Sequence, residues 1–317
     1  MQNVIRVGIS SCLLGQEVRY DGGHKRDRYI VDTLGDYFEW LPVCPEVEFG
    51  MGTPREPIRL ERAGGDVRLV TINTRQDITS GMRRFAARRA AALAKADLSG
   101  YLLKKDSPSC GVQRVKVYPN EKGQARREGV GMFAAALVEA CPNLPVEDEG
   151  RLCDARLREN WIQRVFAYHA LRGLWRPRWT IGDLVAFHTR HKFVIMSHDE
   201  PAFRSLGRLV AGAKKVPRAE LRTTYESQFM QALKRIATPR KNTNVLQHMY
   251  GFLKTKLDTA SRQELIGHIE DYLQGLVPLV VPLTLLRHYV RVFEIDYLAD
   301  QVYLNPHPKE LSLLNHV

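Results

Sequence analysis

The first half of the chain alternates short apolar runs with longer amphipathic segments. The apolar runs predict strands at residues 4–10, 40–43, 67–73 and 100–103. The amphipathic segments predict helices at residues 29–38, 78–96 and 131–140, and Asp77 or Thr79 is placed to cap the second of them. This alternation predicts an α/β domain with a mostly parallel sheet covered by helices.

The second half of the chain has a helical period almost throughout. We expect helices at about 153–173, 181–198, 202–214, 218–236, 243–257, 262–274 and 282–294. Capping boxes are expected at 180–183 and 261–264. An acidic, proline-containing stretch between Cys141 and Cys153 separates the two patterns. We therefore divide the chain into an α/β domain over 1–150 and an all-α domain over 151–317.

Neither a signal peptide nor a membrane span is expected. The first residues lack an apolar core and a cleavage site, and the most apolar stretch, 276–286, is interrupted by two prolines. A bilayer span needs about 20 apolar residues. Five cysteines, an odd number in a long chain without a secretion signal, argue against a disulfide framework. We expect a cytoplasmic protein without a membrane partner. The sequence carries no signal for an oligomeric state.

Positive charge is concentrated in the second half. Residues 1–150 hold 22 basic and 20 acidic side chains, a net charge of +2, whereas residues 151–317 hold 25 and 15, a net charge of +10. A basic module beside a near-neutral one indicates a polyanion such as nucleic acid, although a basic protein without such a partner has the same composition. The substrate-binding candidates here are Lys192, Lys214 and Lys215, within a basic region that continues to Arg222.

The aromatic side chains and the histidines of the second half each permit two interpretations. Trp161, Trp175, Trp179 and Tyr250 are candidates for stacking on bases, but most such residues belong to a core. His188, His191 and His198 share one helix face. That spacing permits a metal site, but without an acidic partner we favour a packed or RNA-facing stripe.

Three cysteines of the first half follow predicted strands. Cys12, Cys44 and Cys110 come after VGIS, WLPV and YLL. The carboxyl ends of parallel strands lie on one edge of a sheet, so these thiols can converge. Three thiolates can hold a zinc ion or three irons of a 4Fe–4S cluster, and unrelated buried thiols are the remaining alternative. Cys141 and Cys153 have no comparable placement.

Other polar residues lie next to these cysteines in the sequence. Glu46 is two residues past Cys44, and Ser107 and Ser109 precede Cys110. A carboxylate beside a metal centre can activate water, and a hydroxyl can orient a substrate carbonyl. An ordinary loop acid and turn-capping serines would have the same pattern.

Several motifs together resemble the thiouracil desulfidase (TudS) domain. They are SSCLLG, VRYDGG, LPVCPEV, GTPREP, LKKDSPSCG and PVEDEGRL, in that order over nearly all of residues 1–150. In the second half, LVAFHTRHKFVIMSH and FRSLGRLVAGAKK resemble the YbgA-like domain. The pairing resembles the RudS family of tRNA 4-thiouridine desulfidases. Phe49 and Met51 depart from the smaller residues of related sequences, which affects the expected pocket shape.

The resemblance implies a 4Fe–4S cluster held by Cys12, Cys44 and Cys110, with one iron open to the substrate sulfur. It implies catalytic roles for Glu46 and Ser107, with Ser109 as the alternative serine. Lys104 would assist the substrate or proton transfer, and Tyr20 and Asp21 would contact the substrate or support its loop. The implied substrate is thiolated tRNA. Because the exchange of sulfur for oxygen involves no redox change, no nicotinamide or flavin cofactor is implied.

Two other functions remain open at the level of sequence. One is a desulfidase for free thiouracil or thiouridine compounds, in which the helical half serves docking or assembly. The other is a non-catalytic RNA-binding protein with a structural zinc. Iron and sulfide content distinguishes the second of these from either enzyme.

Overall fold

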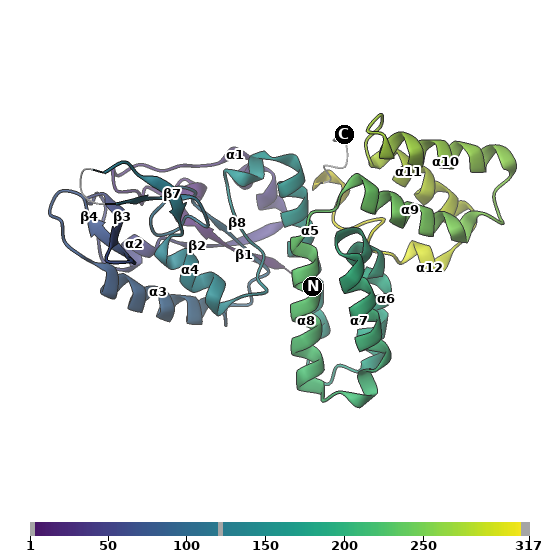
Figure 1. The fold of residues 1–317 in the computed structure, drawn as a ribbon, viewed down its shortest axis with the longest axis horizontal. Coiled ribbons are helices and arrows are strands. Elements are labelled where there is room, and N and C mark those ends of the chain that lie inside the picture. The colour runs from purple at the N-terminus through teal and green to yellow at the C-terminus, as the bar shows by residue number, and fades with distance from the viewer. Residues whose placement is uncertain (1–3, 120–122, 312–317) are drawn as a thin grey trace. The chain divides into compact units, whose positions relative to one another are not determined.

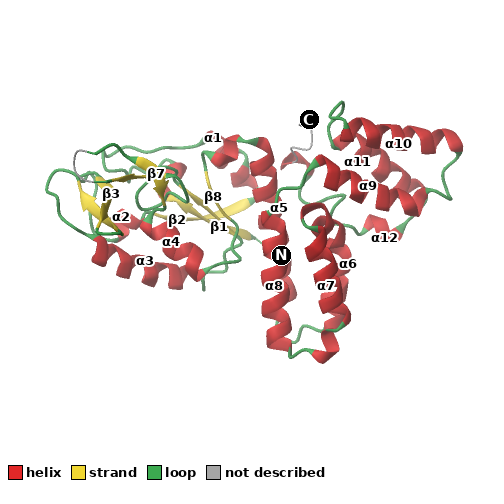
Figure 2. Ribbon diagram, viewed as in Figure 1, coloured by secondary structure: helices red, strands yellow, loops and turns green. Residues whose placement is uncertain are grey.

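The computed structural model describes residues 4–119 and 123–311. The chain divides into two compact units, one ending at Cys153 and the other beginning at Asp154. Strands are confined to the first of these within the described residues, and the second is built from helices (Figure 1, Figure 2). The predicted order, an α/β part followed by an all-α part, is confirmed.

A parallel sheet forms the centre of the first unit. Its strands, in spatial order, are β2 (Phe38–Val43), β1 (Ile5–Ser10), β5 (Gly100–Leu103) and β8 (Val146–Asp148). Every neighbouring pair is parallel. A strand that is covered on both faces has a nearly continuous run of apolar residues in its sequence. Because β1 and β5 have such runs, the sequence predicted them. The three-residue β8 was not predicted.

A second sheet was not predicted. It has the order β4 (Asp66–Thr71), β3 (Ile58–Ala63), β6 (Val115–Tyr118) and β7 (Arg126–Gly129). The strand expected at 67–73 is β4 and belongs to this sheet, where it pairs antiparallel with β3. Gly64 and Gly65 both have positive φ at the turn between them, a conformation that suits a two-residue hairpin.

Among its described residues, the first unit has four α-helices. They are α1 (Arg28–Asp32), α2 (Pro45–Glu48), α3 (Thr79–Leu93) and α4 (Met132–Ala140). The helix expected at 29–38 is wrong in length, because it ends at Asp32 and Phe38 already pairs with Ile5 in the sheet. As expected, the Asp77 carboxylate accepts a hydrogen bond from the Thr79 amide at the start of α3 (2.9 Å).

The second unit consists of helices around one apolar core. The helices are α5 (Ala155–Leu174), α6 (Ile181–His198), α7 (Glu200–Ala211), α8 (Arg218–Lys234), α9 (Pro239–Leu253), α10 (Thr259–Leu273), α11 (Val280–Val292) and α12 (Asp296–Ala299). The first seven match the predicted helices, and α12 was not predicted. In the part of the chain that is described, no helix combines the length and apolar character that crossing a bilayer requires.

The two predicted capping boxes have different outcomes. Thr180 and Asp183 form the expected reciprocal box at the start of α6. The box expected at Ser261 is wrong, because α10 begins earlier, at Thr259, and is capped by Asp258. The Asp258 carboxylate accepts from the Ser261 amide at 2.7 Å.

The three histidines of α6 are packed inside the second unit. His188 lies 3.1 Å from the Tyr225 hydroxyl, and His191 lies 2.8 Å from the Phe187 carbonyl. His198 contacts the Arg235 carbonyl. Burial lowers the pKa of each to about 4. Of the alternatives, a packed stripe is what the structure contains. Trp161 and Trp175 are likewise buried.

Candidate active site

Three adjacent strands deliver the three predicted cysteines to the same end of the parallel sheet. Cys12 follows β1 in a 3-10 turn (Ser11–Leu14), Cys44 follows β2 directly, and Cys110 lies on the loop after β5. Because β2, β1 and β5 are neighbours and parallel, their carboxyl ends lie side by side. Cys12, Cys44 and Cys110 all line one cavity of about 400 Å³. The predicted convergence of the thiols is therefore present in the structure.

The turn carrying Cys110 is held by Ser107 and by close packing. The Ser107 hydroxyl accepts hydrogen bonds from the amides of Ser109 (3.2 Å) and Cys110 (3.0 Å). At Gly131, before α4, a Cβ atom would lie only 2.4 Å from the Ser109 carbonyl oxygen. Only glycine allows the start of α4 to approach the turn so closely.

Cys44 and Glu46 share the start of a short helix. Cys44 is the N-cap residue of α2, and its sulfur lies 3.8 Å from Glu46 Oε2 and 3.7 Å from the Val18 carbonyl oxygen. Pro45 between them has the fixed φ that suits the first helical position. The thiol and the carboxylate are therefore positioned by one rigid element.

The Glu46 carboxylate is held from both sides. Arg55 donates to Oε2 at 2.8 Å, and the Ser107 hydroxyl donates to Oε1 at 3.4 Å. The side chain of Arg55 is only 5% exposed and that of Glu46 is 14% exposed. Arg55 also donates to the Gly52 carbonyl oxygen at 2.9 Å. A buried ion pair with these additional bonds fixes the orientation of the carboxylate.

Burial dominates the electrostatics of the three thiols. It raises the pKa of Cys12 to about 11, with the charges of Cys44 and Glu46 adding to the effect and that of Lys104 opposing it. Burial and the charge of Glu46 also raise the pKa of Cys44, and raise that of Cys110 well above its usual value. The thiols therefore keep their protons unless a cationic centre stabilises the thiolates.

Lys104 lines the same cavity as Cys12. Its amide donates to the Ser10 hydroxyl at 3.0 Å, and its ammonium forms an ion pair with Glu149. The Glu149 carboxylate also accepts from the Lys105 amide at 2.7 Å. Glu149 therefore fastens the loop after β5 and keeps the Lys104 cation at the cavity.

The remaining predicted site residues of this unit have different positions. Tyr20 lines the cavity, and its carbonyl accepts from the Arg55 amide at 2.9 Å. Asp21 is exposed and does not line the cavity. Its carboxylate accepts from the Gly23 amide (3.1 Å), which shapes the loop. Ser109 is fully buried, does not line the cavity, and its hydroxyl has no hydrogen-bond partner among the described residues.

Two polar residues of the site were not assigned a role from the sequence. Arg55 and Glu149 both lie inside motifs that signalled the resemblance, GTPREP and PVEDEGRL. Their partners are Glu46 and Lys104, nine and 45 residues away in the chain. The two motifs marked Arg55 and Glu149 as part of the resemblance. Which residues they pair with is determined by the tertiary structure, so the sequence did not indicate it. Within residues 4–119 and 123–311, no group of three or more His, Cys, Asp or Glu side chains forms a ready-made site for a metal ion.

Comparison with known proteins relates the two units to different families. The profile of the 2-thiouracil desulfurase family matches residues 7–149, and that of a family described as protein of unknown function (DUF1722) matches residues 192–308. The uncharacterized protein YbgA of Escherichia coli (strain K12) is 31% identical over 159 residues, which cover 50% of this chain and 94% of that protein. The uncharacterized protein YbbK of Bacillus subtilis (strain 168) is 32% identical over 147 residues, 44% of this chain and 95% of that protein. The chain joins a 2-thiouracil desulfurase domain to a YbgA-like domain.

A solved structure is also similar to part of this chain. It is titled [4Fe-4S]-dependent thiouracil desulfidase TudS, is 33% identical, and covers 47% of this chain and 93% of its own, with a TM-score of 0.39. The family profile supports a desulfidase activity for the desulfurase domain.

In the YbgA-like domain the predicted lysines have two kinds of environment. Lys214 and Lys215 are exposed in the 3-10 turn (Ala213–Lys215) between α7 and α8. Lys192 is half-buried, and its ammonium lies 4.8 Å from the ring centre of Phe193 and 4.6 Å from that of Tyr297. Lys214 and Lys215 are therefore accessible to a polyanion, whereas Lys192 is engaged with aromatic rings.

Proposed function

We propose that this protein is a desulfidase that converts 4-thiouridine in tRNA to uridine and releases sulfide. Cys12, Cys44 and Cys110 would hold a 4Fe–4S cluster for this reaction. The observation that carries the proposal is the convergence of the three thiols, from three neighbouring strand ends, on one cavity beside Glu46. The match to the 2-thiouracil desulfurase family supports the same class of reaction.

The donor set of the cavity fits such a cluster. Thiolates are the usual protein ligands of iron–sulfur clusters, and three of them leave one iron without a protein ligand. The positive charges of Lys104 and Arg19 oppose the rise in the pKa of Cys12 and would offset the negative charge of bound thiolates. A cavity of about 400 Å³ is of the size that accepts a small ligand. When bound, the cluster supplies an open, Lewis-acidic iron with affinity for soft sulfur.

Glu46 would act as the general base of the reaction. The carboxylate accepts a proton from a water molecule, whose oxygen then forms a bond to the carbon that bears sulfur. Arg55 holds the carboxylate in place. The Ser107 hydroxyl, which donates to Glu46 Oε1, would have to leave that carboxylate in order to donate to a substrate carbonyl. Water supplies the oxygen and both protons of the released hydrogen sulfide, so the reaction needs no external electrons.

The proposal of tRNA as substrate rests on the YbgA-like domain. The excess positive charge lies in the half of the chain that contains it, and Lys214 and Lys215 are exposed there. Contacts to phosphates provide affinity with little sequence preference. To reach the cavity, the thiolated base would have to leave its stack in the folded tRNA.

Anaerobic incubation of the full-length, iron-loaded protein tests this function. Three substrates are compared at equal concentration: tRNA containing 4-thiouridine, free 4-thiouridine and free 2-thiouracil. We expect sulfide release from the tRNA with an equal gain of uridine among its nucleosides. Sulfide released from the free compounds alone would refute the tRNA assignment, and absence of sulfide with all three would refute the desulfidase itself.

A further inference from the structure

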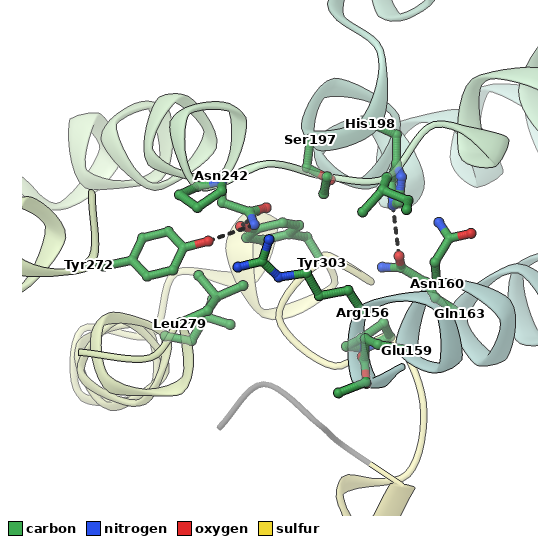
Figure 3. Close-up of a pocket in the computed structure, with 16 residues that line it drawn as sticks. Arg156, Glu159, Asn160, Gln163, Ser197, His198, Asn242, Tyr272, Leu279 and Tyr303 are labelled. Atoms are coloured by element: carbon green, nitrogen blue, oxygen red, sulfur yellow. Dashed lines mark hydrogen bonds between the residues drawn. The ribbon is translucent and has the colours of Figure 1, made fainter. Parts of the chain in front are cut away.

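The YbgA-like domain contains a cavity of its own, separate from the cysteine site (Figure 3). Its volume is about 130 Å³. Its walls come from both ends of the domain's sequence: the first turns of α5, the end of α6, the start of α9, helices α10 and α11, and the segment around Tyr303. A cavity assembled from so many elements has a shape set by the whole domain.

One wall of this cavity is a chain of buried hydrogen bonds. The Tyr303 hydroxyl donates to Asn242 Oδ1 at 3.0 Å, and Asn242 Nδ2 donates to the Tyr272 hydroxyl oxygen at 2.9 Å. All three side chains are more than nine-tenths buried. The Tyr272 oxygen already accepts a hydrogen bond, so its own O–H remains available as a donor. Burial raises the pKa of Tyr272, which keeps that proton in place.

Arg156 adds a positive charge to the same wall. It extends from the first turn of α5 toward Tyr272 and Asn242 (Figure 3). The positive charge of Arg156 acts to lower the pKa of the Tyr272 hydroxyl, in opposition to burial. No hydrogen-bond or ion-pair partner of its guanidinium is found among residues 4–119 and 123–311. A guanidinium with free donors beside a donating hydroxyl is an arrangement suited to an oxyanion.

The acid in the cavity is bonded to a histidine. Glu159 also lines the wall, but His307 Nε2 lies 2.6 Å from its Oε1. Burial opposes a charge on His307, yet the hydrogen bond and the charge of Glu159 outweigh burial and raise its pKa. The partner of Glu159 in this wall is therefore His307. The other walls combine the apolar side chains of Ile236, Leu279 and Leu283 with polar ones that have partners within the domain. These are Asn160, Gln163, Ser197 and His198.

The size of the cavity limits what enters it. With a volume of about 130 Å³, the cavity is large enough to hold a small polyatomic group. Whole nucleotides and drug-sized ligands need about 300 Å³ or more. We propose that this cavity is a binding site for a phosphate group, held by the Arg156 guanidinium and the Tyr272 hydroxyl. The phosphate belongs either to an RNA strand or to a free small anion.

Binding to the full-length protein tests this site without reference to catalysis. The probes are inorganic phosphate, measured by titration calorimetry, and a short uridine oligonucleotide, measured by fluorescence anisotropy at fixed salt. Arg156→Gln removes the charge of an exposed side chain, so the fold should be kept. Tyr272→Phe removes only the hydroxyl. Lys256→Gln, an exposed position that does not line the cavity, is the control with the same loss of charge.

We expect Arg156→Gln to weaken binding by about tenfold or more, since a hydrogen bond to a charged group contributes roughly 1.5–3 kcal/mol. Tyr272→Phe should weaken binding less, and Lys256→Gln should leave it nearly unchanged. If this pattern is seen with inorganic phosphate, the site takes a free anion. If it is seen with the oligonucleotide alone, the site takes a phosphate of RNA. If neither probe distinguishes Arg156→Gln from Lys256→Gln, the site does not exist.

Discussion

Arg55 and Glu46 form a buried ion pair in the lining of the cysteine cavity, with 2.8 Å between Nη2 and Oε2. The guanidinium also bonds to the Gly52 carbonyl, so the arginine is itself fixed. The arginine thereby determines where the carboxylate points. We therefore regard Arg55 as a positioning residue for Glu46.

Arg55→Gln should lower kcat by roughly tenfold to a hundredfold, because small misplacements of a catalytic group are costly. It should also destabilise the protein, since an unpaired buried charge costs about 3–5 kcal/mol. Arg55→Lys should recover part of kcat. The control is Arg62→Gln, which breaks an exposed pair with Glu128. Steady-state kinetics and thermal unfolding check this. Equal kcat in Arg55→Gln and Arg62→Gln would contradict the role.

Glu46→Gln should keep the cluster but lower turnover by about 10²- to 10⁴-fold, the range for loss of a general base. The amide has the shape of the carboxylate but cannot take a proton from water. Glu48→Gln is the matched control, because Glu48 is on the same helix and pairs with Arg89 at 2.7 Å. Iron content and sulfide release are measured together. Full turnover in Glu46→Gln would remove Glu46 from the mechanism.

Each of the single substitutions Cys12→Ala, Cys44→Ala and Cys110→Ala should abolish cluster binding and activity. Two thiolates would remain, too few to hold three irons. Cys153→Ala, which removes an exposed thiol that does not line the cavity, should have no effect. The measurement is iron and acid-labile sulfide per chain after anaerobic purification. Zinc without sulfide in the unmodified protein would favour a structural metal instead.

The double replacement of Lys214 and Lys215 by Gln should weaken tRNA binding and reduce its dependence on salt. Each lost phosphate contact lowers the slope of log K against log salt by about 0.7–0.9. The double replacement of Lys254 and Lys256, also exposed, is the control with the same change in charge. Affinity is measured over a series of salt concentrations. An identical slope in the two double variants would place the RNA surface elsewhere.

Acid should destabilise the YbgA-like domain through its buried histidines. The pKa values of His188, His191 and His198 fall from 6.5 to about 4 on folding, mainly by burial. Above pH 6.5 these histidines are neutral in both the folded and the unfolded chain, and the free energy of unfolding is not reduced by them. As the pH falls toward 4 that free energy decreases, because the unfolded chain binds more protons there than the folded chain does. Each unit of pKa shift corresponds to about 1.4 kcal/mol.

His191→Asn tests this pH dependence, since asparagine can still donate to the Phe187 carbonyl. Between pH 6.5 and 5, the Tm of the variant should fall less steeply than the Tm of the unmodified protein. His248→Asn, at an exposed position of α9, should follow the unmodified protein. Parallel curves for all three proteins would mean that His191 does not contribute to the acid sensitivity.

The sequence predicted those elements whose patterns are set by burial. The strand at Gly100–Leu103 is buried at all four positions, and α6 has the predicted bounds. The second sheet was missed because its strands are short or polar; three of the four residues of β7 are exposed. In β3, Glu61 is an inner residue held by Arg59 and Arg75, which conceals the apolar alternation.

The candidate site was predictable to the extent that strand ends determine it. Three cysteines after parallel strands were expected to meet, and they line one cavity. Whether Ser107 or Ser109 faces that cavity depends on the path of a tight turn, which residue types alone do not specify. The structure places Ser107 at the cavity and buries Ser109. The pairing of Arg55 with Glu46 similarly required the folded chain.

The three thiols come after strands of the parallel sheet, whereas Tyr20, Arg55 and Glu56, which line the same cavity, belong to loops between elements. The anchoring of the cysteines and the outline of the substrate pocket are therefore separable. Insertions or exchanges in residues 16–27 and 50–57 could alter which thiolated base is admitted, while the spacing of the cysteines stays the same. A fold in which different segments hold the cysteines and line the substrate pocket can change its substrate specificity while the positions of the cysteines stay the same.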